Sequence, residues 1–528
     1  MACSKILSGD LPELTNDIIK YLLDDFSTLH SCILVNRLWC RLTIPLLWEN
    51  PFSIPTRNYN FIDFYLNNLN DDFKSKLNEY KINNSLPLNN NNTLFNYPKF
   101  LKYLNTYNFI DYVNMWIDTS TIKTSIPKNK IYSISDFRKL IDILLFKTFI
   151  ENEVNLNTLE IDTSNIYYNL YYDIILELIL QNTNFIHNIK NLKLHIVNYN
   201  ENVIIKISQI INLHQNLKKI FIENNYLPLY KSLLLLKGCN CSNTTLNTII
   251  FYHINFKGIN NLDKVFKQLN VLESLHIIYC SLNTDFTQQI INLNKSFKLK
   301  SLFINEESQI DESLLLLLKK SGDYLENLGF SPSYKLSLIL KQQLLESFIK
   351  YNKNMKFLDF SRFENQFIYL TLNLIENVKQ NLNYLAINVY ENFQSYIIEY
   401  SSIILQNLGQ ILPHKLEYLS LILCIKESDM EIFLKNSQNI FIKKLLINLI
   451  HNRLYEDSNI LPHIKEYIMK KKRVKYLAII GTFSEKYPRY GDLSYFKNEV
   501  EEFKLHDIKV QCYYDLLFNI HDFAKKIN

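Results

Sequence analysis

A short hydrophobic pattern returns along most of the chain from residue 156 onward. It has the form Φ-x-x-Φ-x-Φ, in which Φ is an apolar residue, and its first copy is "LNTLEI". The copies begin at residues 156, 189, 217, 246, 272, 299, 325, 355, 382, 416, 442 and 474, so that successive copies lie 26 to 34 residues apart. An alternation of apolar and polar positions is typical of a strand with one buried face. Each copy is therefore predicted to be a β-strand.

The segments between the copies have the apolar spacing of helices, as in "DESLLLLLKK" and "LKQQLLESFIKY". One strand and one helix in every 26 to 34 residues indicate a leucine-rich-repeat solenoid, whose usual period is about 20–29 residues. Stacked copies form a parallel sheet on the concave side of a curved array. We therefore expect an α/β fold, with a domain of about twelve repeats over residues 154–528. The fourth and sixth positions of each copy should be buried, and the third and fifth should face the concave side.

The third position of the copies changes character along the chain. It is mostly polar in the earlier copies and mostly aromatic in the later ones. Exposed aromatic side chains on a rigid sheet are good anchors for a protein partner. The candidate substrate-binding residues are therefore Phe357, Tyr384, Tyr418 and Tyr476. The alternative is that tyrosine, present 35 times in the chain, is simply frequent in strands.

Two copies extend into a turn that carries an Asn or Cys. "LKKIFIENNYL" places Asn225 there, and "LESLHIIYCSL" places Cys280 there. Such a side chain can hydrogen-bond to the backbone of the neighbouring turn. We interpret Cys280, and by analogy Cys424, as structural residues of this kind rather than as metal ligands.

The first fifty residues have a different pattern, that of a small helical unit. Asp10 can cap a helix, and Glu13 follows at the spacing of a capping box. Apolar residues then recur at helical spacing: Leu11, Leu14, Ile18 and Leu22. Because so short a segment buries little surface by itself, its apolar side chains need a partner.

A second helix is expected to begin after Ser27 and to end at Pro45. Its apolar face would consist of Leu29, Cys32, Val35, Trp39 and Leu42. The unit would close with Leu46, Leu47 and Trp48, so that two of the 3 tryptophans of the chain would stabilise it.

These residues resemble the F-box motif. The resemblance covers residues 8–52 and rests on the Leu11-Pro12 start, the spaced leucines, the Val35/Trp39 pair and the later Trp48. It implies a three-helix unit that docks onto the S-phase-kinase-associated adaptor of a cullin–RING ubiquitin ligase. The adaptor-binding residues that it implies are Leu11, Pro12, Leu14, Ile18, Leu22, Val35 and Trp39. The alternative is a helical cap on the repeats that binds no partner.

Residues 53–153 are predicted to be a helical connector. "NNSLPLNNNN" (83–92) is of low complexity and is expected to be a loop. Phe100, Leu101, Leu104 and Phe109 suggest a helix after it.

Composition narrows the possible functions. The net charge is +5 and the basic residues are dispersed, whereas nucleic-acid-binding proteins cluster them, so we expect no nucleic-acid partner. The 8 cysteines are scattered, which favours reduced thiols inside a cell. The sequence shows no apolar stretch of about 18 residues, so no membrane span is expected. The expected location is cytoplasmic, nuclear or both.

Motifs of known chemistry are missing from the sequence. It contains no phosphate-binding loop, no His-Glu-x-x-His and no Gly-x-Ser-x-Gly. Cys239 and Cys241 are too few for a zinc site, which requires four ligands. "KKKR" (470–473) is either a nuclear import signal or the basic end of a helix. We therefore expect no catalytic residue, no metal and no cofactor.

Together, the sequence patterns favour a non-catalytic substrate receptor of a ubiquitin ligase. Its partners would be the adaptor, the cullin ligase and a target protein. The alternative is a leucine-rich-repeat scaffold with no role in ubiquitin ligation.

Overall fold

The computed structural model describes residues 12–527, except for residues 24, 55–58, 79–92, 120–133, 198–200, 215, 224–244, 260–261, 270, 294–297, 332–335, 362–364, 390–396, 451–458 and 484–489. Leu11, Asn225, Cys239, Cys241 and the Asn-rich stretch at 83–92 lie outside the described residues. The chain divides into two compact units. Unit 1 comprises Met1–Asn247 with Gln268–Val271, and unit 2 comprises Thr248–Lys267 with Leu272–Asn528.

Unit 1 begins with helices and continues into alternating helices and strands. Its helices are α2 (Pro12–Lys20), α3 (Phe26–Ile33), α4 (Arg37–Leu47), α5 (Phe61–Asn67), α6 (Asp71–Asn78), α7 (Thr106–Thr119), α9 (Ile134–Glu151), α10 (Asn169–Gln181) and α11 (Glu201–Leu213). Its strands are β1 (Tyr103–Asn105), β2 (Thr158–Asp162), β3 (Asn191–His195) and β4 (Lys219–Glu223), each parallel to the next.

Unit 2 repeats one strand and one helix many times. Its strands are β5 (Thr248–Tyr252), β6 (Ser274–Cys280), β7 (Lys298–Ile304), β8 (Asn327–Phe330), β9 (Phe357–Ser361), β10 (Tyr384–Asn388), β11 (Lys415–Leu423), β12 (Phe441–Leu449), β13 (Val474–Thr482), β14 (Tyr490–Asp492) and β15 (Lys509–Val510). Its helices are α14 (Leu262–Gln268), α15 (Thr284–Ile291), α16 (Glu312–Ser321), α17 (Leu338–Tyr351), α18 (Ile368–Val378), α19 (Ile397–Ile411), α20 (Glu427–Asn436), α21 (Leu461–Ile464), α22 (Lys497–Leu505), α23 (Tyr513–Leu516) and α24 (Ile520–Lys526). From β5 to β13 each strand runs parallel to its neighbours.

The predicted strands are confirmed at all twelve copies of the pattern. Most of the described neighbouring copies pair at their third positions, as Thr158 does with Asn191 and Tyr384 with Tyr418. Between β6 and β7 the register shifts, so that Ser274 pairs with Lys298 and His276 pairs with Ser301. The fourth and sixth positions are buried in every copy, for example Leu385 and Ile387. The fold is therefore mixed α/β, with long runs of parallel strands.

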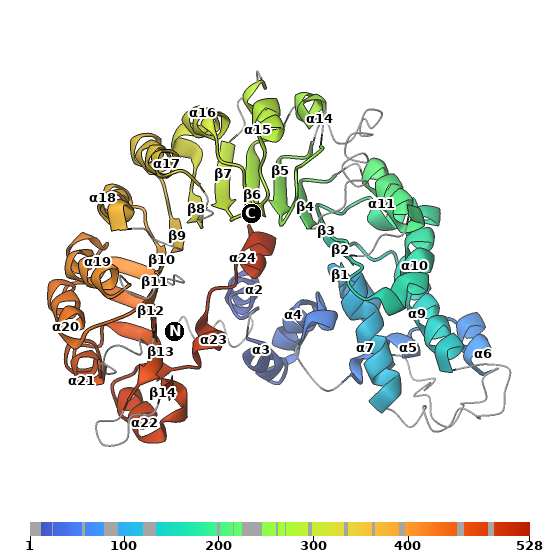
Figure 1. The fold of residues 1–528 in the computed structure, drawn as a ribbon. Helices are drawn as coiled ribbons and strands as arrows, with labels where there is room; N and C mark the ends of the chain where they lie inside the picture. Colours follow the sequence, from blue (N-terminus) through green and yellow to red (C-terminus); the bar gives the residue numbers. More distant parts are fainter. Residues whose placement is uncertain are drawn as a thin grey trace. The chain divides into compact units, whose positions relative to one another are not determined.

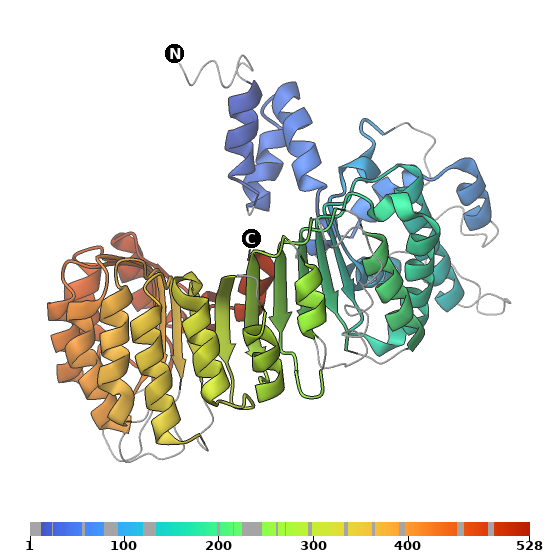
Figure 2. The same ribbon diagram turned by 90° about the horizontal axis from the view of Figure 1, so that it is seen from above.

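The two faces of the unit 2 sheet are covered differently. Helices α14 to α20 lie along one face, and Figure 2 shows the yellow to orange helices standing side by side in a row. We call the other face, to which the third and fifth positions belong, the open face. The last helices, α23 and α24, lie on that face (Figure 1).

Side chains cap the start of several helices. Asn36 accepts a hydrogen bond from the Trp39 N–H at 2.9 Å, and Asn283 accepts one from the Phe286 N–H at 3.0 Å. Asp311 accepts one from the Ser313 N–H at 2.9 Å. A side-chain oxygen at this position satisfies an N–H group that the helix leaves unpaired. These residues mark where α4, α15 and α16 begin.

Cys280 has the structural role that the sequence indicated. Its thiol donates to the Phe251 carbonyl and accepts the Ile254 N–H, each at 3.4 Å, in the neighbouring repeat. Burial raises the pKa of the Cys280 thiol to about 12, so that it remains protonated and able to donate. For Cys424 the described contact is made by the backbone, whose N–H donates to Ser401 Oγ at 3.0 Å.

The structure corrects the sequence prediction at three places. Residues 103–105 form strand β1, where a helix was expected. Asp25, not Ser27, caps α3 by accepting the Thr28 N–H at 3.0 Å. The second expected helix is two helices: α3 ends at Ile33 with Leu34 as its C-cap, and the Asn36 side chain caps the start of α4. Pro45 lies inside α4 rather than at its end.

Gly409 allows α19 and α20 to pack closely. A Cβ built on Gly409 would lie 2.7 Å from the Phe433 carbonyl oxygen and 2.9 Å from the Asn436 Cβ, both in α20. Real Cβ atoms do not approach backbone oxygens this closely, so any larger side chain must push the helices apart.

We expect Gly409→Ala to destabilise the protein. An alanine inside a helix normally stabilises it by about 1 kcal/mol relative to glycine, but overpacking costs about 1–3 kcal/mol. Because the contacted atom is backbone, the second effect should exceed the first, and the urea midpoint should fall. Gln410→Ala, at the exposed neighbouring position, is the matched control and should be neutral or slightly stabilising. An unchanged midpoint for Gly409→Ala would show that α19 can move away freely.

Candidate interaction surfaces

The N-terminal helices α2, α3 and α4 share a small core of their own. Ile19, Leu29, Cys32 and Trp39 are buried together, and Leu22 packs against them. Trp39 and Leu22 thus support the helical unit from inside and contribute little exposed surface to a partner.

The same helices carry apolar side chains that no part of the described chain covers. In α2, Thr15 and Ile19 face the core, whereas Leu14 and Ile18 are 46% and 37% exposed. Pro12 is also exposed, and Leu34 and Val35 are exposed where α3 ends. Apolar residues gathered on the outside of a small unit are typical of a surface that binds a partner. Of the residues that the resemblance implied, Pro12, Leu14, Ile18 and Val35 are therefore accessible.

Trp48 has a different role from Trp39. Its ring lies 4.3 Å from that of Tyr97 and 5.2 Å from that of Tyr65, measured between ring centroids. Both partners belong to the connector, so Trp48 does not close the helical unit as expected. It joins α4 to the aromatic core that follows, and the backbone adds to this, because the Lys102 N–H donates to the Glu49 carbonyl at 2.9 Å.

The aromatic residues predicted to bind a substrate form one row on the open face of unit 2. The ring centroids of Phe357 and Tyr384 are 5.8 Å apart and the rings are inclined by 29°; those of Tyr384 and Tyr418 are 6.0 Å apart and the rings are inclined by 28°. We call Phe357, Tyr384 and Tyr418 the aromatic stripe. Tyr476 lies one strand further on than Lys444, which pairs with Tyr418, and packs, half-buried, against the same cluster as Tyr418.

The expectation that this row is exposed was wrong for two of its members. Phe357 is 3% exposed and Tyr418 is 2% exposed, because the segment after β15 lies over them. Tyr513 and Leu516 of α23 are buried in one cluster with Tyr418. Beyond them, Phe518 lies on all three rings of the stripe, at centroid distances of 4.9 Å from Phe357, 5.4 Å from Tyr384 and 5.8 Å from Tyr418.

Helix α24 extends this cover. The Phe523 ring stacks on that of Phe357 at 5.6 Å, and the His521 ring lies 5.1 Å from that of Tyr252 in β5. Ala524 is fully buried. Sequence reasoning missed Phe518 and Phe523, since they lie outside the repeat pattern.

One polar contact fixes the segment to the stripe. The Phe518 N–H donates to the Tyr418 hydroxyl oxygen at 3.0 Å. Burial raises the pKa of Tyr418 to about 12, so the hydroxyl is neutral at physiological pH.

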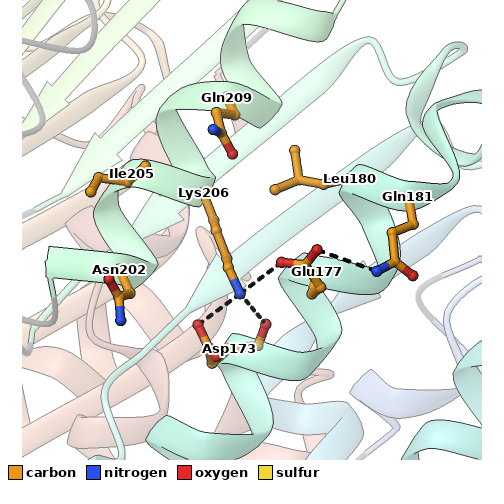
Figure 3. A pocket seen from close by; sticks show the side chains of 8 residues that line it. All are labelled: Asp173, Glu177, Leu180, Gln181, Asn202, Ile205, Lys206 and Gln209. Atoms are coloured by element: carbon orange, nitrogen blue, oxygen red, sulfur yellow. Dashed lines mark hydrogen bonds and ion pairs between the residues drawn. The ribbon is translucent and has the colours of Figure 1, made fainter.

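A pocket between α10 and α11 of unit 1 is polar and is occupied by its own ion pairs (Figure 3). The Lys206 ammonium lies 2.9 Å from a carboxylate oxygen of Asp173 and 2.9 Å from one of Glu177. Burial lowers the pKa of Lys206, but the two carboxylates raise it by more, so its net pKa is raised. Since its cation is already paired, we assign no ligand to this pocket.

Comparison with known proteins did not identify a family for this chain. Neither a scan against protein-family models nor a search of curated proteins found a match. No helix in the described part of the chain combines the length and apolar character that a membrane crossing requires.

Proposed function

We propose that this chain is the substrate-binding subunit of a cullin–RING ubiquitin ligase of the Skp/cullin/F-box type. Helices α2, α3 and α4 would be the F-box and dock onto the adaptor. The parallel strands with their helices would be leucine-rich repeats that bind a target protein. Ubiquitin transfer would be carried out by a partner enzyme, and this subunit would contribute proximity.

The observation that carries the proposal is the exposed apolar surface on a helical unit that already has its own core. A terminal cap would use its apolar side chains against the repeats, whereas Leu14, Ile18 and Val35 point away from the packed residues. These are residues that the F-box resemblance assigns to the adaptor contact.

The link between the helical unit and the connector also supports a receptor. Trp48 packs among aromatic rings of the connector, and two N–H groups, of Lys102 and Tyr103, donate to the Glu49 carbonyl at 2.9 and 3.0 Å. A receptor that presents a target to a partner enzyme benefits from a rigid connection of this kind.

We expect the full-length chain to bind the purified adaptor, and Leu14→Asp with Ile18→Asp to weaken this binding at least about 30-fold. A charge introduced into an apolar contact of the hot-spot kind removes about 2 kcal/mol or more. Isothermal titration calorimetry measures the dissociation constants. The substitutions leave Thr15 and Ile19, the buried residues of α2, in place.

Leu316→Asp is the matched control, because Leu316 is also an exposed helical leucine, in α16 of unit 2. It should bind the adaptor like the unmodified chain. If the unmodified full-length chain does not bind, the ligase role is wrong, and a protein-binding scaffold becomes the better explanation. Equal loss in all variants would point to unfolding rather than to a contact.

A further inference from the structure

Unit 1 carries a second group of aromatic side chains, and this one is accessible. We call Tyr107, Tyr168 and Tyr171, all half-buried, the tyrosine patch. The ring centroid of Tyr168 lies 6.1 Å from that of Tyr107 and 6.0 Å from that of Tyr171. The buried Tyr172 supports the patch from inside, with its ring 6.4 Å from that of Tyr168, and the preceding residue of the chain, Tyr167, is 84% exposed. Unlike Phe357 and Tyr418 of the aromatic stripe, these rings are open to a partner.

The tyrosine patch is held by the segments that follow β1 and β2. Tyr107 lies in the first turn of α7, directly after β1, whereas Tyr168 and Tyr171 follow β2, just before and within α10. Because β1 and β2 are parallel, both segments leave the sheet at the same edge. The Thr106 hydroxyl donates to the Asp162 carbonyl at 3.2 Å and accepts the Asp162 N–H at 3.0 Å. These hydrogen bonds fix the start of α7 against the end of β2.

Two carboxylates lie beside the tyrosine patch. Asp111 follows Tyr107 by one helical turn, and the Tyr168 hydroxyl donates to its carboxylate at 3.4 Å. Asp162 ends β2, and its carboxylate accepts the Ser164 N–H at 2.9 Å. Burial raises the pKa of the Tyr107 hydroxyl, and the charges of Asp111 and Asp162 raise it further. Both acids are therefore close enough to the Tyr107 ring to act on the same ligand.

Neither carboxylate has a cationic partner within the described residues. The ion pairs of unit 1 that the structure describes involve other acids: Asp17, Asp118, Asp173, Glu177 and Glu223. Burial raises the pKa of Asp111, and the hydrogen bond from Tyr168 opposes this only in part. A positive charge brought to this place would favour the ionised carboxylate. The local charge is thus negative, although the chain as a whole has a net charge of +5.

From this combination of accessible rings and unpaired carboxylates, we propose that the tyrosine patch binds an arginine side chain in a basic segment of the target protein. The flat guanidinium stacks on a tyrosine ring and donates hydrogen bonds to Asp111 and Asp162, which a lysine ammonium cannot do in the same geometry. A ligand that carries phosphates would meet the two carboxylates and be repelled. The inference rests on the proposed function only in taking the ligand to be part of a target protein.

The test uses a fluorescein-labelled peptide in which three arginines alternate with glycines. It is titrated against the full chain, with fluorescence anisotropy as the readout, at about 0.15 M salt, where attraction between distant exposed charges is screened. The same peptide with citrulline in place of arginine keeps the shape without the charge and should not bind. The peptide with lysine in place of arginine should bind at least about fivefold more weakly, because an ammonium lacks the planar fork of the guanidinium.

Asp111→Asn with Asp162→Asn should weaken binding of the arginine peptide at least about tenfold, because both charges that face the guanidinium are lost. Asparagine keeps an oxygen that can accept the hydrogen bonds of the replaced carboxylates, so the fold should persist, and circular dichroism checks this. Tyr107→Leu keeps an apolar side chain without the ring and should weaken binding about threefold or more. Asp71→Asn with Asp72→Asn is the matched control, since it removes two exposed carboxylates of α6 in the same unit and should leave the affinity unchanged.

Three results would overturn the proposal. The first is no binding of the arginine peptide by the unmodified chain, or undiminished binding by the Asp111/Asp162 double variant. The second is an equal loss in the Asp71/Asp72 control, because the peptide would then respond to the charge of the whole protein. The third is equal affinity for the arginine and lysine peptides, since stacking on the rings would then contribute nothing. The adaptor takes no part in these titrations, so a failure of adaptor binding is a separate result.

Discussion

Replacing Arg473 by methionine should lower the free energy of unfolding of the protein by about 3–5 kcal/mol, because several hydrogen bonds from a buried charged group are lost together. Methionine keeps most of the volume of the arginine stem. The expected loss therefore reflects the missing hydrogen bonds and not a large cavity.

Arg473 is buried and donates to the backbone of the preceding repeat. Its guanidinium donates to the carbonyl oxygens of Ile440 at 3.1 Å and Leu434 at 3.4 Å, and also to the carbonyl and hydroxyl oxygens of Ser437. A further bond, to the Tyr467 carbonyl at 3.3 Å, ties it to its own repeat. Leu434 and Ser437 lie at the end of α20, where helix carbonyls lack partners and a cation is favourable. Without Arg473 these buried carbonyls lose a donor.

The measurement is urea unfolding of the full chain, followed by circular dichroism. Hydrogen exchange of peptides from α20 and β12 would localise the loss. Lys471→Met is the matched control, since Lys471 is exposed and donates one hydrogen bond, to Gln438 at 3.1 Å. It should change stability by less than about 0.5 kcal/mol. An equal, small effect of both substitutions would contradict the structural role of Arg473.

A second large effect is expected from Asp359→Asn, which should stabilise the protein at pH 7.5 by up to about 3 kcal/mol and leave it nearly unchanged at pH 4. Asp359 lies on the open face in β9, and Tyr279 donates its hydroxyl to it at 3.3 Å. Burial raises the pKa of Asp359 from 3.8 to about 6, and hydrogen bonds from Tyr279 and Ser361 oppose this only in part.

The direction in which stability changes with pH follows from proton binding. The folded chain binds this proton more tightly than the unfolded chain, so the stabilising contribution is fully present below about pH 4. It is lost as the pH rises through about 6, and above that the folded chain holds a mostly buried carboxylate. Asparagine is neutral at every pH and its amide oxygen can still accept from Tyr279, so the variant avoids this loss.

The test compares unfolding free energies of both proteins at several pH values from 4 to 7.5. The difference between them should grow between pH 4 and pH 7 and then level off. Glu273→Gln, which replaces an exposed acid of the same unit, is the control for removing a carboxylate from the surface. If the difference in unfolding free energy between Asp359→Asn and the unmodified chain does not change with pH, water solvates this carboxylate in the folded state.

The repeat architecture was predictable because its signal is local. Each strand copy has alternating apolar positions within six residues, and burial of the fourth and sixth positions follows directly from the period of a strand. The role of Cys280 could be predicted for the same reason, since its place within the repeat determines which backbone groups it meets. Strand β1 was missed because it has only three residues and continues directly into a helix.

The sequence predicted that the N-terminal segment is helical, but it did not predict where each helix begins or which face of α2 is buried. The spacing of Leu14 and Ile18 indicated an apolar helix face, and the structure shows that this face is the exposed one. Which of two apolar faces of α2 becomes buried depends on α3 and α4, and that choice has no local signal. The separate tasks of Trp39 and Trp48 likewise depend on the connector, whose aromatic residues are distant in sequence.

By itself, the sequence determined the strands of the twelve copies, the burial of their fourth and sixth positions, and the row of aromatic residues at one position of successive repeats. Only the tertiary structure decided that the row is covered, by residues about a hundred or more positions further along the chain: Phe518 reaches Tyr418 and Phe357 from outside the repeats. The spacing of apolar residues predicts which face of a strand is buried. It carries no information about which distant segment covers that side, because ring contacts between such segments require no particular spacing in sequence.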